Sequence, residues 1–196
     1  MNFQWMNESE IVCRENRIEI LATPQSDFFC NSGSVSEEGI TPESLSNAPY
    51  YYTEIEGDFV LQVKVSHAFR DTYDSASVMV MADMRNWAKV CFEKTDFGTH
   101  AAVSVVTKNG ESDDANGSNL EGNTAWLKVC RVANTFSFHY SMDGEHYFML
   151  RFFSLPVKET VKLGLLAQAP VGDGGVRIYE NLQIEKKTVK NIRFGI

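Results

Sequence analysis

The stretch Phe59–Val65 reads FVLQVKV, and its apolar side chains recur at every second position. Successive side chains of an extended strand point to opposite faces, so Phe59, Leu61, Val63 and Val65 share one face. Such alternation is typical of a half-buried β-strand. The stretch therefore predicts a strand that packs one face against an apolar core.

The same alternation recurs along most of the chain that follows. Further strands are predicted over residues 77–82, 87–93, 101–107, 126–132, 135–141, 146–153, 161–168 and 175–185. Turn-forming residues such as Asn109-Gly110 and Asp143-Gly144 fall between these stretches, which favours tight antiparallel connections. No stretch keeps a helical period. The pattern predicts an all-β fold, a sandwich or a barrel of antiparallel strands.

Two polar stretches interrupt the pattern, residues 31–47 and residues 111–123, and both are predicted to be loops. Neither is long enough to link separate domains, and strands of the same character continue on both sides. We therefore expect one domain over residues 1–196.

The stretch Trp87–Glu93 has two different faces. Ala88, Val90 and Phe92 point one way, whereas Trp87, Lys89, Cys91 and Glu93 point the other. In a bent jelly-roll one face of a sheet meets the core and the other forms a concave surface. We therefore expect Lys89 and Glu93 to belong to a polar, concave face.

Composition excludes several classes of partner. Hydrophobic residues make up 43% of the chain and charged residues 22%, which are ordinary values for a globular protein. The formal net charge is −8. Binding to phosphate backbones requires an excess of Lys and Arg, so neither nucleic acid nor an anionic membrane is an expected partner.

The N-terminus lacks the basic and apolar regions of a secretory signal, and no apolar run is long enough to cross a membrane. We therefore expect a cytoplasmic protein. Under that expectation the four cysteines, Cys13, Cys30, Cys91 and Cys130, are predicted to be buried or semi-buried free thiols.

From Trp5 onward, a series of short motifs resembles the family called "domain of unknown function 1349". These motifs are Ser26-Asp27-Phe28-Phe29, Gly57-Asp58-Phe59, Tyr73-Asp74-Ser75-Ala76, Trp87-Ala88-Lys89-Val90-Cys91-Phe92-Glu93, Val105-Val106-Thr107, Tyr140-Ser141-Met142-Asp143-Gly144 with Arg151, and Gly164-Leu165 through Ala169-Pro170. Each motif alone is weak, but their order and spacing together are specific.

The resemblance implies a concanavalin A-like jelly-roll of two antiparallel sheets, one of them concave, with a groove that faces a sugar. The sequence departs from the family pattern at three positions. Ser75 stands where the family prefers Gln, Cys91 where it prefers Gly, and Asp114 where it prefers Trp. If the Gln or the Trp contacts a ligand in the relatives, the ligand of this chain is expected to differ or to be absent.

These observations favour a non-catalytic, lectin-like module that binds a carbohydrate through its concave sheet. Carboxylates and guanidinium groups would bind hydroxyls. Tyr73, Trp87 and Trp126 are candidates for stacking on the apolar face of a sugar, but the preferred interpretation is that they complete the core or cover an end of a sheet. The candidate ligand-binding residues are Tyr73, Asp74, Lys89, Glu93, Thr107, Asp113, Arg131 and Arg151. A plain alternative for Lys89 and Glu93 is a ladder of cross-strand salt bridges.

Two other functions stay open. One is a glycoside hydrolase that uses Glu93 together with Asp74 or Asp113, although the acidic run Glu54–Asp58 is interpreted as a loop that enters a strand. The other is a regulatory partner of a metabolic enzyme, or a homodimer paired through exposed sheet edges.

No histidine spacing suits zinc, and we assign no catalytic residue, metal ligand or cofactor. The acidic stretch 111–117 fits the calcium-loop spacing at Asp114, Asn116 and Gly117 only. A solvated turn is therefore the preferred interpretation of this stretch, with calcium binding left open.

Overall fold

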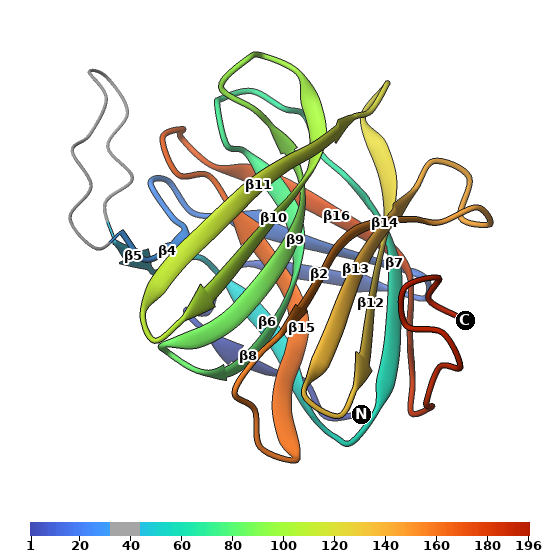
Figure 1. Ribbon diagram of the computed structural model, residues 1–196. Coiled ribbons are helices and arrows are strands. Elements are labelled where there is room, and N and C mark those ends of the chain that lie inside the picture. The colour runs from blue at the N-terminus through green and yellow to red at the C-terminus, as the bar shows by residue number, and fades with distance from the viewer. Residues whose placement is uncertain (32–43) are drawn as a thin grey trace.

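The computed structural model describes residues 1–31 and 44–196. Over these ranges the chain consists of β-strands and their connections, and it contains no helix. Two antiparallel sheets of seven strands each face one another, and a two-stranded ribbon stands at one side (Figure 1). The predicted all-β sandwich is confirmed.

The first sheet supplies one layer. Its strands are β1 (Gln4–Met6), β6 (Tyr50–Glu56), β8 (Ser75–Asp83), β9 (Asn86–Lys94), β10 (His100–Lys108), β11 (Glu111–Asn119) and β15 (Thr160–Gln168). Their spatial order is β1-β6-β15-β8-β9-β10-β11, so β11 forms one edge.

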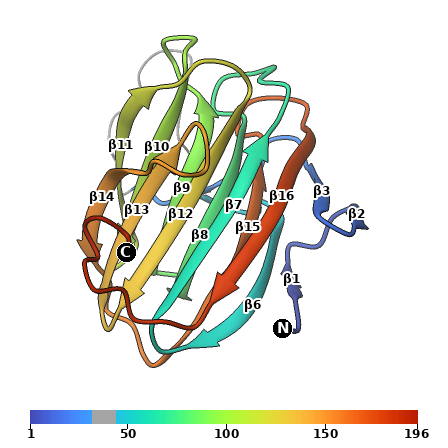
Figure 2. The same cartoon turned by 90° about the vertical axis from the view of Figure 1, so that its right-hand side faces the viewer.

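The second sheet forms the other layer, which lies in front of the first sheet in Figure 2. Its strands are β2 (Ile11–Arg14), β3 (Arg17–Ala22), β7 (Phe59–Ser66), β12 (Thr124–Val132), β13 (Thr135–Ser141), β14 (Phe148–Ser154) and β16 (Gly175–Glu185). Their order is β14-β13-β12-β7-β16-β3-β2, so β14 forms an edge. The short ribbon pairs β4 (Phe28–Phe29) with β5 (Leu45–Ser46).

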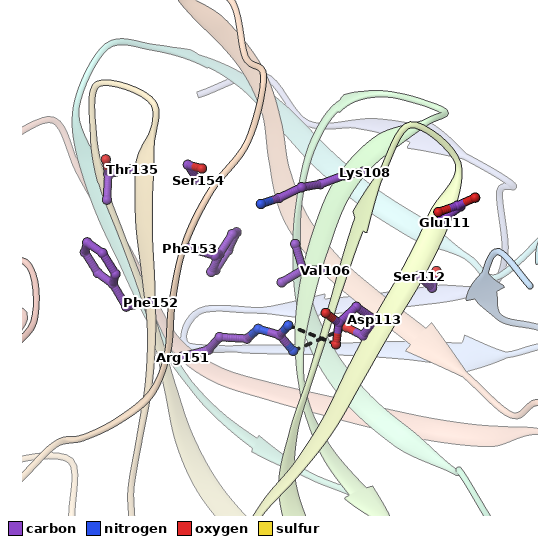
Figure 3. A pocket seen from close by; sticks show the side chains of 10 residues that line it. All are labelled: Val106, Lys108, Glu111, Ser112, Asp113, Thr135, Arg151, Phe152, Phe153 and Ser154. Atoms are coloured by element: carbon purple, nitrogen blue, oxygen red, sulfur yellow. Dashed lines mark hydrogen bonds and ion pairs between the residues drawn. The ribbon is translucent and has the colours of Figure 1, made fainter.

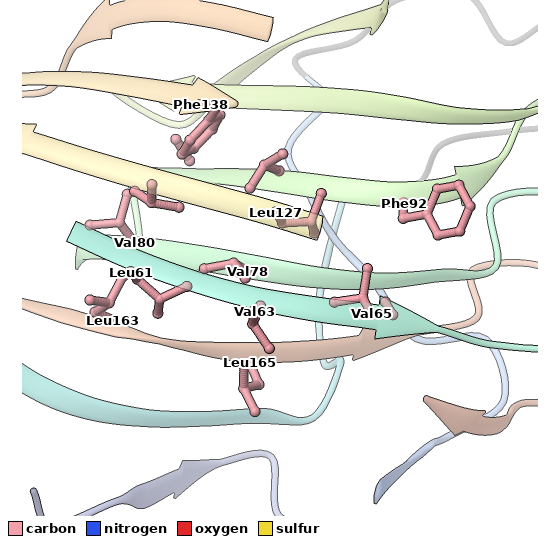
Figure 4. Close-up of a cluster of buried hydrophobic side chains, with 14 of the residues drawn as sticks. Leu61, Val63, Val65, Val78, Val80, Phe92, Leu127, Phe138, Leu163 and Leu165 are labelled. Atoms are coloured by element: carbon pink, nitrogen blue, oxygen red, sulfur yellow. The ribbon is translucent and has the colours of Figure 1, made fainter. Parts of the chain in front are cut away.

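The core lies between the two sheets and is built by alternating residues. On β7, Leu61, Val63 and Val65 are fully buried, and their neighbours on the first sheet are Val78 and Leu163 (Figure 4). Burying each such side chain contributes about 1.5–3 kcal/mol. The alternation in the sequence therefore decides which face of each strand meets the other sheet.

The tight turn between β13 and β14 was also predicted correctly. Asp143 accepts backbone hydrogen bonds from Glu145 and His146, each 2.8 Å long. Gly144 has a φ of +82°, and an added Cβ would lie 2.7 Å from the ring of Trp126. Glycine is required here by both its conformation and its neighbour.

Residues 111–119, predicted to be part of a loop, form β11, so that prediction is wrong. Nearly all side chains of β11 are exposed, because the strand lies at the edge of its sheet and pairs with β10. A strand with both faces in water needs no apolar alternation, and polar side chains at an edge discourage pairing with other chains. Its sequence therefore carries no strand signal.

Three further expectations need correction or limits. Glu54–Glu56, interpreted as a loop, end strand β6. Of the predicted loop over residues 31–47, residues 32–43 lie outside the described residues, and β5 occupies positions 45–46. Cys13 is exposed rather than buried, whereas Cys91 and Cys130 are buried.

No helix within the described ranges is long and apolar enough to cross a membrane.

Leu163→Ala should lower the free energy of unfolding by about 2–5 kcal/mol, because it leaves a cavity between the sheets. Urea denaturation measures this loss. Val176→Ala, at a strand position that is 45% exposed, is the matched control and should change stability by less than about 0.5 kcal/mol. Equal effects of the two substitutions would contradict the assigned core.

Candidate functional site

The predicted two faces of β9 are confirmed. Ala88, Val90 and Phe92 belong to the core between the sheets, whereas Trp87, Lys89, Cys91 and Glu93 lie on the opposite side of the first sheet. We call that side the outer face. It is the surface on which the sequence predicts a ligand-binding floor.

Lys89 is not available to a ligand in this structure. Its side chain is 2% exposed, and its Nζ lies 2.6 Å from Asp27 Oδ1 and donates a 2.9 Å hydrogen bond to Gln168 Oε1. Burial opposes the charge of the ammonium group, but Asp27 and the nearby acids outweigh burial and raise the pKa of Lys89. Lys89 therefore anchors the segment that precedes β4 onto the outer face.

The aromatic residues of the outer face are buried in packing contacts and are not exposed to a ligand. Trp87 is fully buried and meets the edge of Phe28 at a centroid distance of 5.8 Å. Tyr50, Met79 and Leu166 complete this second apolar cluster. Trp87, a candidate for stacking on a sugar, instead holds β4 against the sheet.

Glu93 is the one ligand-binding candidate on the outer face for which the described residues provide no hydrogen bond. Its side chain is 7% exposed. Burial raises the pKa of Glu93 to about 8; Lys89 opposes the shift, and Asp27 and Asp114 add to it. The carboxyl group is therefore largely protonated at neutral pH, and its contact with a ligand stays a prediction.

The carboxylate pairs proposed for a hydrolase are not formed. Asp74 is fully buried and makes a 2.8 Å ion pair with Arg177 of the second sheet, on the core side of the first sheet. Asp113 pairs in register with Val106, a core residue, so it too lies on the side opposite Glu93. The prediction that Glu93 acts with Asp74 or Asp113 is therefore wrong.

Three other candidates also have partners inside the protein or lie in a turn. The Thr107 hydroxyl lies 2.7 Å from Ser112 Oγ, which accepts a hydrogen bond from the backbone of Cys30. Arg131 belongs to the second sheet and donates hydrogen bonds to three backbone carbonyls, those of Ala133, Lys158 and Glu159. Tyr73 lies in the turn before β8, with a φ of +66°.

The remaining two candidates, Asp113 and Arg151, meet at a hollow of about 620 Å³ between the sheet edges (Figure 3). Strands β10 and β11 form one wall, and β13 and β14 form the other. We call this space the edge hollow. Its lining includes Val106, Lys108, Asp113, Thr135, Arg151 and Phe153.

The ion pair between Arg151 and Asp113 spans the edge hollow at one corner. Arg151 Nη2 lies 3.1 Å from Asp113 Oδ1, and Nη1 donates to the backbone oxygen of Asp113 at 3.3 Å and to Ser104 Oγ at 3.4 Å. The Arg151 side chain is 20% exposed and that of Asp113 77%. Both groups therefore keep free donors and lone pairs for a ligand.

The calcium interpretation of residues 111–117 is not supported by the geometry of β11. An extended strand directs neighbouring side chains to opposite faces, so Asp113 faces the edge hollow while Asp114, opposite Val105, faces the outer side. Within the described ranges, no group of three His, Cys, Asp or Glu residues is placed to hold a metal ion.

Most of the groups that define these sites carry no signal of their role in the local sequence. Asp27 was part of a family motif, but nothing indicated that it binds Lys89. Lys108, Thr135 and Ser154 come from the ends of three strands on two sheets, and no local pattern in the sequence relates them.

The sequence profile of a family described as "Protein of unknown function (DUF1349)" matches residues 5–187. A functionally unknown protein from Saccharomyces cerevisiae is similar in structure, with a TM-score of 0.82, 21% identity and coverage of 95% of this chain and 97% of the other. No curated protein matches the chain.

Two further solved structures are similar in fold. The legume lectin-like domain from Entamoeba histolytica has a TM-score of 0.58 at 10% identity, with coverage of 95% of this chain and 91% of the domain. The GH43 BlXynB protein from Bacillus licheniformis has a TM-score of 0.66 at 13% identity, with 86% of this chain and 32% of that protein covered. These likenesses confirm the predicted concanavalin A-like jelly-roll.

Asp74→Ala should lower the free energy of unfolding by about 3–5 kcal/mol, because it leaves the Arg177 charge buried without its partner. Chemical denaturation followed by tryptophan fluorescence measures the loss. Asp113→Ala, which removes the acid of an exposed ion pair, should cost at most about 1 kcal/mol. The structural role of Asp74 is refuted if both variants lose the same amount.

Glu93 should make stability depend on pH. The unfolded chain releases this proton near pH 4.5, whereas the folded chain holds it up to about pH 8. Between these values the folded state binds more protons, so the free energy of unfolding falls as pH rises. Glu93→Gln should remove this decline.

Urea titrations at pH 5, 7 and 9 measure the effect. The exposed Glu145 provides the control, and Glu145→Gln should keep the wild-type slope. Parallel pH profiles for wild type and Glu93→Gln would rule out a buried, proton-binding Glu93.

Proposed function

The chain belongs to the DUF1349 family of proteins of unknown function, and we propose that it is a non-catalytic, lectin-like module that binds carbohydrate in the edge hollow. The observation that carries this proposal is the Arg151–Asp113 pair beside an apolar surface in an open space of about 620 Å³. Pockets of this size hold small ligands in proteins.

The lining of the edge hollow has the chemistry that a sugar requires. A sugar hydroxyl both donates and accepts hydrogen bonds, so a carboxylate beside a guanidinium group can bind it from both sides. Phe153 and Val106 line the same space, and they are 8% and 4% exposed, so only their outer edges would contact the C–H groups of a sugar ring. Lys89, Asp74, Thr107 and Arg131 would then have structural roles instead of contacting the ligand.

The distribution of acids favours binding over hydrolysis. Glycosidases place two carboxyl groups on opposite sides of the scissile bond. The acids of the edge hollow, Glu111 and Asp113, come from one strand and one face, and the facing wall supplies Arg151, Phe153 and hydroxyl groups. A sugar between these walls would have carboxylates on one side only.

The names of the structural relatives point to the same class of ligand. One is a legume lectin-like domain, and another is a GH43 protein of which this chain spans about a third. At 10% and 13% identity these relatives show a shared fold only. Carbohydrate as the ligand of this chain is therefore part of our proposal.

Asp113→Ala should weaken sugar binding by about tenfold or more, because it removes a charged hydrogen-bond acceptor. A glycan array identifies ligands, and isothermal titration with the strongest of them compares the variant with wild type. Glu145→Ala, on the exposed turn between β13 and β14, is the control and should bind as wild type does.

The proposal fails if no glycan of a broad panel binds or raises the melting temperature. It also fails if the Asp113→Ala variant binds the best glycan with wild-type affinity.

A further inference from the structure

Residues 188–196 cover part of the second sheet on its side away from the core, and we call them the cover segment. Figure 2 shows this segment running across that side toward β14. Its Val189 is buried against Val60 and Cys130, which point away from the core because they alternate with core residues of β7 and β12. The cover segment therefore closes a face that would otherwise meet water.

Few interactions hold the cover segment in place. Within the described part of the chain, its backbone-to-backbone hydrogen bonds all connect residues of the segment itself, around Asn191. Side chains supply the attachment: Ser137 Oγ donates a 2.7 Å hydrogen bond to the backbone oxygen of Ile192, and Thr188 Oγ1 donates one of 2.7 Å to Asp58. A segment with so few contacts opens at a lower free energy than the strands of the core.

His139 of β13 lies beneath the cover segment. It is fully buried, it is the register partner of Lys128, and its Nε2 lies 2.8 Å from Ser137 Oγ. A Cβ added at Gly195 of the cover segment would lie 3.2 Å from the same nitrogen. The cover segment therefore shields this imidazole from water.

The surroundings of His139 are unsuited to a second positive charge. Among the described residues, neither His139 nor Lys128 forms an ion pair with an acid. The Lys128 ammonium lies instead over the Tyr147 ring, 3.6 Å from its centroid, and His139 Nδ1 is buried without a hydrogen-bond partner. The titratable and charged groups of the elements around His139 are Lys128 and Cys130 of β12, Tyr147 of the turn before β14, Glu185 of β16 with its ion-pair partner Lys187, and Arg193 of the cover segment.

The protonation of His139 is linked to the position of the cover segment. Burial lowers the pKa of His139 to about 4, the Lys128 charge adds to this effect, and a hydrogen bond with the backbone of Ile192 opposes it. An imidazole in water has a pKa of about 6.5. Between these two values the closed arrangement binds fewer protons than one in which His139 meets water, so a falling pH favours opening.

We propose that the cover segment is an acid-sensitive latch: protonation of His139 releases residues 188–196 from the second sheet and uncovers the Cys130 thiol with the apolar surface around it. This device is independent of the carbohydrate function. Glu93 acts in the opposite sense on the fold as a whole, because its raised pKa makes the folded state more stable as pH falls. Acid can therefore open the latch while the two sheets stay folded.

The reactivity of Cys130 toward 4,4′-dithiodipyridine, which reacts with thiols in neutral and weakly acidic solution, tests the latch. In a Cys13→Ser, Cys30→Ser background, mass spectrometry of peptides follows Cys130 and Cys91 separately. Each rate is divided by that of the same thiol in urea-unfolded protein at the same pH. From pH 7.5 to pH 5 this ratio should rise about tenfold or more for Cys130, whereas Cys91, buried on the first sheet, should keep its value.

Two variants assign the effect to His139. His139→Gln should give a Cys130 ratio that is the same at both pH values, even where the substitution loosens the cover segment. Lys128→Gln should reduce the rise, because loss of the neighbouring charge raises the pKa of His139. His146→Gln changes an exposed histidine in the turn before β14, and this control should keep the full rise.

The latch is wrong if the Cys130 ratio does not change with pH. It is equally wrong if Cys91 and Cys130 rise together, because acid would then be unfolding the whole protein. A rise that persists in His139→Gln, or that is undiminished in Lys128→Gln, would overturn the role of His139.

Discussion

The packing of two apolar sheet faces against each other is the constraint on which the rest of this structure depends. Each strand can turn only one of its two faces toward the core, so every second residue is committed to the interior. Leu61, Val63 and Val65 of β7 meet Val78 and Leu163 of the first sheet in this way. The polar residues between core positions are then directed outward, toward the two surfaces of the sandwich.

The edge hollow follows from the same alternation at the place where the core ends. Asp113, opposite Val106, and Arg151 occupy positions on the inner side of their strands, but they lie at the two edges β11 and β14. Beyond the last apolar layer, polar side chains at inner positions line an open space instead of a core. The site that we propose is thus a continuation of the interior, built from the facing edges of both sheets.

Several charged residues that suggested ligand binding instead hold the fold together. Lys89 fixes the segment before β4, Asp74 and Arg177 join the two sheets, and Arg131 binds three backbone carbonyls. The three departures from the family pattern, Ser75, Cys91 and Asp114, lie on the outer face through their register with Glu93, Val103 and Val105. All three positions therefore lie on the same face of the first sheet as the buried Glu93.

From Phe59 onward, local sequence was sufficient to predict the strands that bury at least one face, because period-two alternation and turn residues are properties of neighbouring positions. The earlier strands β3 and β6, which also contain buried residues, were not predicted. Local sequence predicted β7, β9 and the Asp143-Gly144 turn, and it assigned Ala88 and Lys89 to opposite faces. It could not identify β11, since an edge strand in water needs no apolar pattern. Tertiary structure alone decided that Asp27 meets Lys89, that Asp74 meets Arg177, and that Asp113 meets Arg151. Those contacts join residues up to about a hundred positions apart, and only the register and packing of the two sheets bring them together.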